Sequence, residues 1–208
     1  MRPWFAVSLV FMLAAPAAFA SFGGGSAPSE PPNRPADNAQ SDDPSGQPSA
    51  RQRAERLYGD AYNDVAKAKQ DLDEGKSKDA EKRFRRALDR AKDAAQLDTG
   101  YVEAWNLIGF ASRKLNDYPS SLAAYQRCLT LDPNFAPARE YLGEAYVELG
   151  KPADAREQLV WLVKLGKDDD AKTLRAKIEA YEAAHPDSLA VPGKRDSVNL
   201  NVTKSSGE

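Results

Sequence analysis

Few side chains in this sequence have the types and spacings that catalysis or metal binding requires. His185 is the only histidine and Cys128 the only cysteine among the 208 residues. General-base chemistry by histidine and His-rich metal sites are therefore nearly excluded. We predict that His185, beside Pro186, is an ordinary exposed residue. Cys128 has no CxxC partner, so we predict a small buried hydrophobe, with a reactive thiol as the alternative.

An acidic run and the glycine patterns also lack the context that a site needs. The run Asp168-Asp169-Asp170 has neither the alternating ligands nor the glycine and late glutamate of an EF-hand loop, so we expect these residues to cap a helix and to favour its dipole. No GxxxxGK[ST] or GxGxxG motif is present. The sequence therefore predicts no catalytic residue, no cofactor and no metal, and we do not expect an enzyme.

Basic residues are concentrated in one predicted helix, between residues 82 and 90. Acidic residues are interleaved with them, and Asp79–Arg83 and Glu81–Arg85 have the spacing of ion pairs along a helix. We therefore predict a solvated helix face, with a patch for nucleic acid or an acidic partner as the alternative. The basic residues are Lys82, Arg83, Arg85, Arg86 and Arg90.

The first twenty residues have the three parts of a secretory signal. Met1-Arg2 is positively charged, residues 4–15 are apolar except for Ser8, and Ala18-Phe19-Ala20 offers small residues for cleavage. The pattern predicts a cleaved signal peptide over residues 1–20 and an exported protein, periplasmic if the host is a Gram-negative bacterium. An uncleaved membrane anchor is the alternative. No second apolar stretch follows, so we expect no stable membrane insertion after cleavage.

Composition divides the remaining chain into a helical core and two polar tails. Residues 21–50 are crowded with Gly, Pro and Ser, and residues 185–208 are polar with Pro and Gly, so we predict a disordered linker and a disordered tail. Residues 51–184 are rich in helix-forming residues with apolar positions three and four apart, which predicts an all-α domain. Removal of Arg2 with the signal would leave 28 basic against 31 acidic residues, and this balance favours neither nucleic acid nor anionic lipid.

A repeat with an offset of 34 residues lies within this domain. Gly109 and Gly143, which pair at this offset, fall where two helices must approach closely. Asn116 and Gly150, which also pair, fall at a turn. An earlier unit, with its turn at Gly75, begins about seven residues too early, and the surplus is most easily placed in a second helix that runs to Leu97. The matched pairs include Ile108 with Leu142, Gly109 with Gly143, Asn116 with Gly150, Ser121 with Ala155, Tyr125 with Leu159, and Cys128 with Leu162.

This outline resembles the tetratricopeptide repeat, a 34-residue helix–turn–helix unit with the pattern W-x2-L-G-x2-Y, A-x3-F and P. The resemblance implies a short α-solenoid of about three repeats, over residues 61–101, 102–135 and 136–167, closed by a capping helix at about 168–184. Ser112 replaces the first Tyr of the pattern in the middle unit, and Arg139 replaces the Trp in the last. The matching residues of the middle unit are Trp105, Ile108, Gly109, Tyr125 and Pro133.

In such arrays the first helices of successive repeats line a concave surface, and the resemblance implies that a peptide or a partner helix binds there. We therefore expect an extracytoplasmic adaptor that binds a polypeptide, with a structural or assembly subunit of a cell-envelope complex as the alternative. Phe110 would anchor an apolar side chain and Arg113 or Lys69 a carboxylate, or else Phe110 is merely a partly covered helix residue. The predicted groove residues are Lys69, Asn106, Phe110, Arg113, Glu140, Glu144 and Val147.

Overall fold

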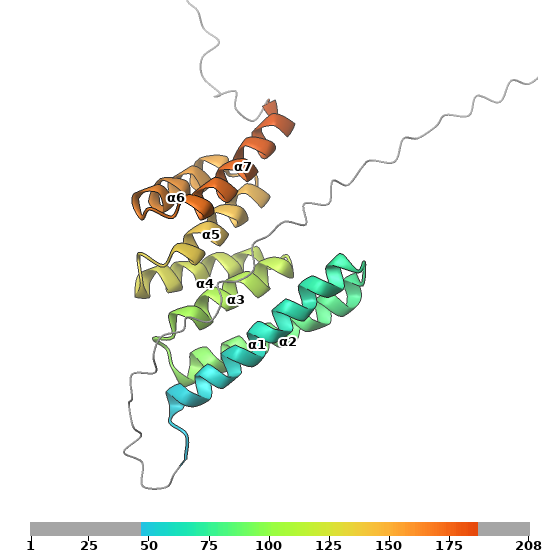
Figure 1. Cartoon of the computed structure of the whole chain (residues 1–208), viewed down its shortest axis with the longest axis vertical. Coiled ribbons are helices and arrows are strands. Elements are labelled where there is room, and N and C mark those ends of the chain that lie inside the picture. The colour runs from blue at the N-terminus through green and yellow to red at the C-terminus, as the bar shows by residue number, and fades with distance from the viewer. Residues whose placement is uncertain (1–46, 187–208) are drawn as a thin grey trace, which may run out of the picture.

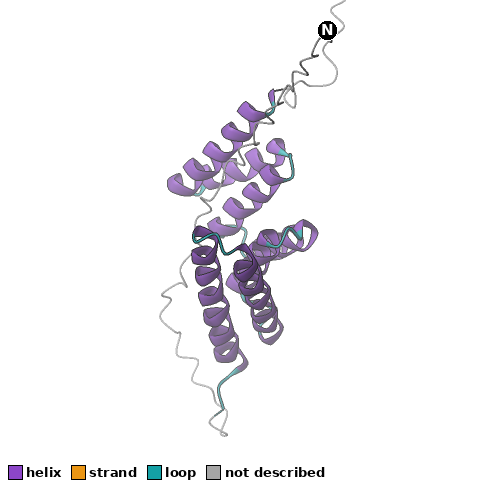
Figure 2. Ribbon diagram, turned by 90° about the vertical axis from the view of Figure 1, so that its right-hand side faces the viewer, coloured by secondary structure: helices purple, strands orange, loops and turns teal. Residues whose placement is uncertain are grey.

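The computed structural model of the protein describes residues 47–186, and all regular elements within that range are α-helices (Figure 2). The predicted all-α solenoid is therefore confirmed. The predicted signal peptide, most of the predicted linker and the tail beyond Pro186 lie outside the described residues. The helices are α1 (Ala50–Asp73), α2 (Ser77–Leu97), α3 (Val102–Lys114), α4 (Tyr118–Leu131), α5 (Ala136–Glu148), α6 (Pro152–Lys164) and α7 (Asp168–Ala184).

The prediction that the linker extends to residue 50 is wrong at its last two residues. Ser49 is the N-cap of α1 and Ala50 its first residue. The Ser49 hydroxyl accepts the Gln52 backbone N–H at 3.1 Å, and the Ser49 backbone N–H donates to the Gln52 side chain at 2.8 Å. This reciprocal capping box satisfies two N–H groups that the helix start would otherwise leave without partners.

Successive helices pack against one another as antiparallel hairpins. The pairs α1–α2, α3–α4 and α5–α6 stack in chain order, and α7 lies at the far end against both α5 and α6 (Figure 1). Asn116 and Gly150 form the turns within two of these hairpins with positive φ angles of 61° and 71°. At the Asn116 turn the Asp117 N–H donates to the Ser112 carbonyl at 2.9 Å, so the left-handed residue closes the helix end as the paired sequence positions predict.

The first hairpin is longer than the other two. The helix α2 contains 21 residues, whereas α4 contains 14. The helix α2 ends at Leu97, as predicted from the additional residues of the first repeat. The additional turns pack Ala54 and Tyr58 of α1 against small residues of α2. Because alanines occupy these contacts, the two helices can approach closely at this end of the hairpin. The α2 alanines are Ala91, Ala94 and Ala95.

Arginines of α2 bind α1 and do not form a free basic face. Arg86 and Arg90 both form ion pairs with Asp64 of α1, which is only 4% exposed. The predicted Glu81–Arg85 pair is present at 2.5 Å. The predicted Asp79–Arg83 pair is wrong, because Arg83 turns toward α1 and forms an ion pair with Asp71 at 2.5 Å. Arg83, Arg86 and Arg90 thus join the two helices of the long hairpin, whereas Arg85 pairs within α2.

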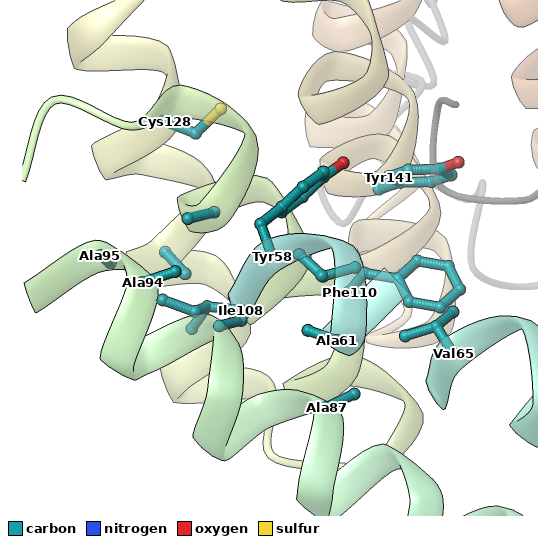
Figure 3. Packing of buried hydrophobic residues seen from close by; sticks show 14 of the residues in the cluster. Tyr58, Ala61, Val65, Ala87, Ala94, Ala95, Ile108, Phe110, Cys128 and Tyr141 are labelled. Carbon is teal, nitrogen blue, oxygen red and sulfur yellow. The ribbon is translucent and has the colours of Figure 1, made fainter. Parts of the chain in front are cut away.

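Glycine and serine allow the middle hairpin to pack closely. A Cβ atom on Gly109 would lie 2.6 Å from the Tyr125 ring, so a glycine is required for α4 to approach α3. The Ser121 hydroxyl donates to the Gly109 carbonyl at 2.8 Å in the same contact. Aromatic rings continue this core toward neighbouring helices, with Phe110 and Tyr141 at 5.2 Å between centroids (Figure 3).

The last helix covers the end of the solenoid. Ala171, Leu174 and Ile178 of α7 are buried in a second core cluster with residues of α5 and α6. Gly143, the counterpart of Gly109, contacts Leu174 of α7. The N-cap of α7 is Lys167 and no side-chain hydrogen bond caps this helix. Residues 168–170 form its first turn, so the expected side-chain capping is wrong, whereas their position fits the expected stabilisation through the helix dipole. Within residues 47–186, no helix is long and apolar enough to cross a membrane.

Candidate functional site

Most of the predicted groove residues lie in the core of the molecule. Phe110 is fully buried, and Arg113 is 2% exposed. Asn106, Glu140 and Glu144 are buried as well, whereas Lys69 and Val147 are half-buried. The expectation that Phe110 and Arg113 present their side chains to a partner is therefore wrong. They form the floor beneath a groove, and other residues form its surface.

Phe110 is buried because aromatic side chains from other helices surround it. Its ring centroid lies 6.4 Å from that of Phe84 on α2 and 5.2 Å from that of Tyr141 on α5. Val65 of α1 belongs to the same cluster, and Figure 3 shows it beside the Phe110 ring. The guanidinium of Arg113 and the ammonium of Lys114 lie over the ring at 5.6 Å each. The apolar contacts come from three other helices, so the position of Phe110 on the inner face of α3 does not leave it exposed.

Arg113 is the centre of a buried ionic network. It forms ion pairs with Glu144 at 2.6 Å and with Glu148 at 2.7 Å, and both Arg113 and Glu144 side chains are 1% exposed. Lys177 of α7 approaches the other oxygen of Glu144 to 2.5 Å. Burial opposes the charge on Glu144, but Arg113 and Lys177 outweigh it and hold the pKa of its carboxyl below the usual value. The network joins α3, α5 and α7 beneath the groove.

A cavity of about 420 Å³ opens above this network between α3, α5 and α7. Lys114, Glu148 and Lys177 supply its charged wall, whereas Val147, Tyr181 and small alanines supply an apolar wall. His185 stacks on Tyr181 with 4.2 Å between ring centroids, so the exposed histidine forms part of the rim. The lining residues are Lys114, Glu144, Val147, Glu148, Lys177, Ala180, Tyr181, Ala184 and His185.

Lys114 is one of several lining residues that the sequence prediction missed, because that prediction included only Glu144 and Val147 of this lining. It is half-buried, and within residues 47–186 no carboxylate lies within ion-pair distance of its ammonium group. Burial, reinforced by the charge of Arg113, lowers the pKa of Lys114 to about 8. One signal was available in the sequence. The residues three and four positions before it, Ala111 and Phe110, are apolar, so no preceding acidic residue of its own helix can pair with it.

Lys69 lies on α1 and is half-buried. Burial lowers the pKa of Lys69, and Lys177 adds to this effect, whereas Asp73 and Glu144 oppose it. Glu144 and Lys177 of the network therefore act on Lys69 electrostatically. Of the residues predicted for the groove, Glu144 and Val147 line the cavity.

Neither Cys128 nor the carboxylates within residues 47–186 form a site for thiol or metal chemistry. Cys128 is fully buried, and burial raises the pKa of its thiol far above the usual value. A thiol in such a setting reacts poorly, because the thiolate is the nucleophile. Within residues 47–186, no group of three or more His, Cys, Asp or Glu residues is placed to hold a metal ion.

The similarity of this chain to known proteins lies in its helical repeats. Two models of the tetratricopeptide repeat family match it, one over residues 65–134 and the other over residues 112–178. No curated protein matches the chain. The solved structure of the Arabidopsis OM64 TPR domain is similar over 64% of this chain and 99% of that domain, with a TM-score of 0.52 and 15% sequence identity. This likeness concerns the fold alone.

Two further solved structures are more distant. The complex of the Yersinia enterocolitica type III secretion chaperone SycD with a peptide of the translocator YopD is matched over 62% of this chain and 92% of that one, with a TM-score of 0.45 and 18% identity. The TPR2B domain of yeast Sti1, from a complex with pHsp70, is matched over 61% and 98%, with a TM-score of 0.47 and 15% identity. The two family models together span residues 65–178, which is more than half of the sequence, and the chain belongs to the tetratricopeptide repeat family.

Proposed function

We propose that this protein is an extracytoplasmic adaptor that holds a partner polypeptide in the groove between α3, α5 and α7. The observation that carries the proposal is the cavity of about 420 Å³ on the inner helices, which combines an apolar wall with charged groups at its edge. Clefts of this size with few polar groups suit a side chain or short segment of a ligand. The signal pattern in residues 1–20 supports the extracytoplasmic location.

The experiment is affinity capture from a cell-envelope fraction with a groove variant and a matched control. Ala180 lines the cavity, so Ala180→Arg would fill it with a long charged side chain. Ala176 lies one turn away on the same helix and is exposed outside the cavity, which makes Ala176→Arg the control. We expect the wild type and Ala176→Arg to recover the same partner and Ala180→Arg to lose it. Recovery of that partner by Ala180→Arg would contradict the proposed groove.

Phe110 and Arg113 are unsuitable for this experiment. Their substitution would remove a buried ring or leave Glu144 without its main partner, so the fold itself would be destabilised. Loss of binding would then say nothing about the groove surface. Ala180 and Ala176 avoid this ambiguity, because neither side chain is fully buried.

A second candidate function is a structural subunit that docks through the outer face of α6. Val160 and Val163 are about half exposed, at 51% and 50%, and Trp161 is 39% exposed. Exposed apolar side chains grouped on one helix are typical of protein interfaces. Light scattering of the purified protein distinguishes the two functions. A monomer that still captures its partner favours the adaptor, and self-association that Val160→Lys with Val163→Lys abolishes favours the structural subunit.

A further inference from the structure

A second cavity, of about 300 Å³, lies on the other side of Lys114. It is bounded by Leu72 at the end of α1, by the first turns of α2, and by the end of α3. Leu72 is 44% exposed and lines this cavity together with the buried ring of Phe84. The lining residues are Leu72, Ser77, Ala80, Glu81, Phe84, Lys114, Leu115 and Asn116. Lys114 is the residue that both cavities share.

The charges around Lys114 leave it with a surplus positive charge. Glu144 is held by Arg113 and Lys177, and Glu148 is held by Arg113. Glu81, which lines the second cavity, forms its ion pair with Arg85 at 2.5 Å. Each carboxylate that lines either cavity thus has a cationic partner other than Lys114. A half-buried ammonium group without a carboxylate is costly, and an incoming carboxylate would relieve that cost.

Apolar surface is available on both sides of this charge. Leu72 and Leu115 border the second cavity, whereas Val147, Ala180 and Tyr181 border the first. A ligand that spans Lys114 therefore meets apolar contacts, then one positive charge, then apolar contacts again. Resting on the proposed function, we propose that the partner segment carries an aspartate or glutamate flanked by apolar residues, with its carboxylate bound by Lys114 and its apolar side chains in the two cavities.

A peptide-display selection tests this inference while the partner is still unidentified. Random dodecamer peptides on phage are selected against the immobilised full chain, against Ala180→Arg and against Lys114→Met. Lys172→Met serves as the matched control, because Lys172 is exposed on α7 and lines neither cavity. We expect the wild type and Lys172→Met to enrich peptides with an acidic residue between apolar residues, and Lys114→Met to lose the acidic preference.

The affinity of one enriched peptide then measures the contribution of its carboxylate. Replacement of the acidic residue by its amide should weaken binding to the wild type by about tenfold or more at pH 7, as expected for a charge-assisted hydrogen bond. The two peptides should bind Lys114→Met with equal affinity. Lys172→Met should discriminate between them as well as the wild type does.

Each other outcome contradicts a different claim. Peptides that require an open cavity at Ala180 but show no acidic preference would overturn the role of Lys114 and leave the proposed groove intact. An acidic preference that persists in Lys114→Met would assign recognition to another cation and overturn this inference. Absence of any enrichment that depends on Ala180 would overturn both the inference and the proposed function.

Discussion

Arg113 and Lys114 are adjacent in the sequence and carry the same charge, but the fold treats the two side chains differently. Arg113 points into the molecule, where Glu144 and Glu148 neutralise it. Lys114 lies between two cavities, and within residues 47–186 no carboxylate pairs with it. Removal of the Arg113 charge should therefore destabilise the protein, because carboxylates compensate that charge. Removal of the Lys114 charge should stabilise it, because no carboxylate compensates that charge.

Lys114→Met should stabilise the protein at neutral pH. Lys114 titrates near pH 8 in the folded protein and at about 10.4 in an unfolded chain. Between these values the unfolded state binds more protons, so the stability contributed by this group rises with pH, and below pH 8 the charged lysine destabilises the fold. We expect Lys114→Met to raise the free energy of unfolding by about 1–2 kcal/mol at pH 7. Urea denaturation should show a smaller gain at about pH 9.5, and a variant less stable than the wild type at pH 7 would contradict this account.

Glu144→Gln should have the opposite effect. It leaves Lys177 without its carboxylate and Arg113 with Glu148 alone, so we expect a loss of about 3 kcal/mol at pH 7. The folded pKa of Glu144 is depressed, so its contribution is fully present above the unfolded value of about 4.3 and is lost as pH falls through the folded pKa. Urea denaturation at pH 7 and in acid measures both effects. Glu148→Gln is the control, and because Glu148 is 39% exposed its cost should stay below about 1 kcal/mol.

At the scale of helices, two glycines test how the hairpins pack. Gly59 lies within α1 with no heavy atom within 4 Å of a Cβ placed there, so Gly59→Ala should stabilise the protein by about 0.5–1 kcal/mol through helix propensity. Gly109→Ala would place a Cβ 2.6 Å from the buried Tyr125 ring, and we expect a loss of about 1–3 kcal/mol from overpacking. Thermal unfolding of both variants checks the pair, and equal effects would show that propensity alone governs these positions.

The helices and their turns could be predicted from the sequence because local signals determine them. Asn116 and Gly150 end helices through their own backbone conformation, and Gly109 is small because it contacts a tyrosine ring of the next helix. Burial of Phe110 beneath the groove could not be predicted from the sequence, because distant contacts determine it. Phe110 is covered by Phe84 and Tyr141, which lie on helices before and after its own repeat. The inner face of α3 is thus determined by contacts between repeats, and a pattern within one repeat does not encode them.

At the scale of the whole molecule, the core within residues 47–186 consists of two clusters, and Tyr146 of α5 packs against both of them. The larger cluster extends from α1 to α5, and the smaller one joins α5, α6 and α7. In a solenoid each repeat contacts only its neighbours, so stability is distributed along the chain and its ends open more easily than its middle. The groove lies where the smaller cluster meets the network of Arg113. Partner binding should therefore depend on the stability of the C-terminal helices.

Leu174→Ala tests this dependence. Leu174 is fully buried against Gly143 and belongs to the smaller cluster, so truncation should cost about 2–5 kcal/mol of local stability. Hydrogen exchange measured by mass spectrometry should accelerate in α6 and α7, whereas the long hairpin α1–α2 should keep its protection. The matched change Phe84→Ala, in the larger cluster, should accelerate exchange in α1 to α3. Equal acceleration in every helix from α1 to α7 after Leu174→Ala would mean that the molecule unfolds as one unit and that the groove has no separate stability.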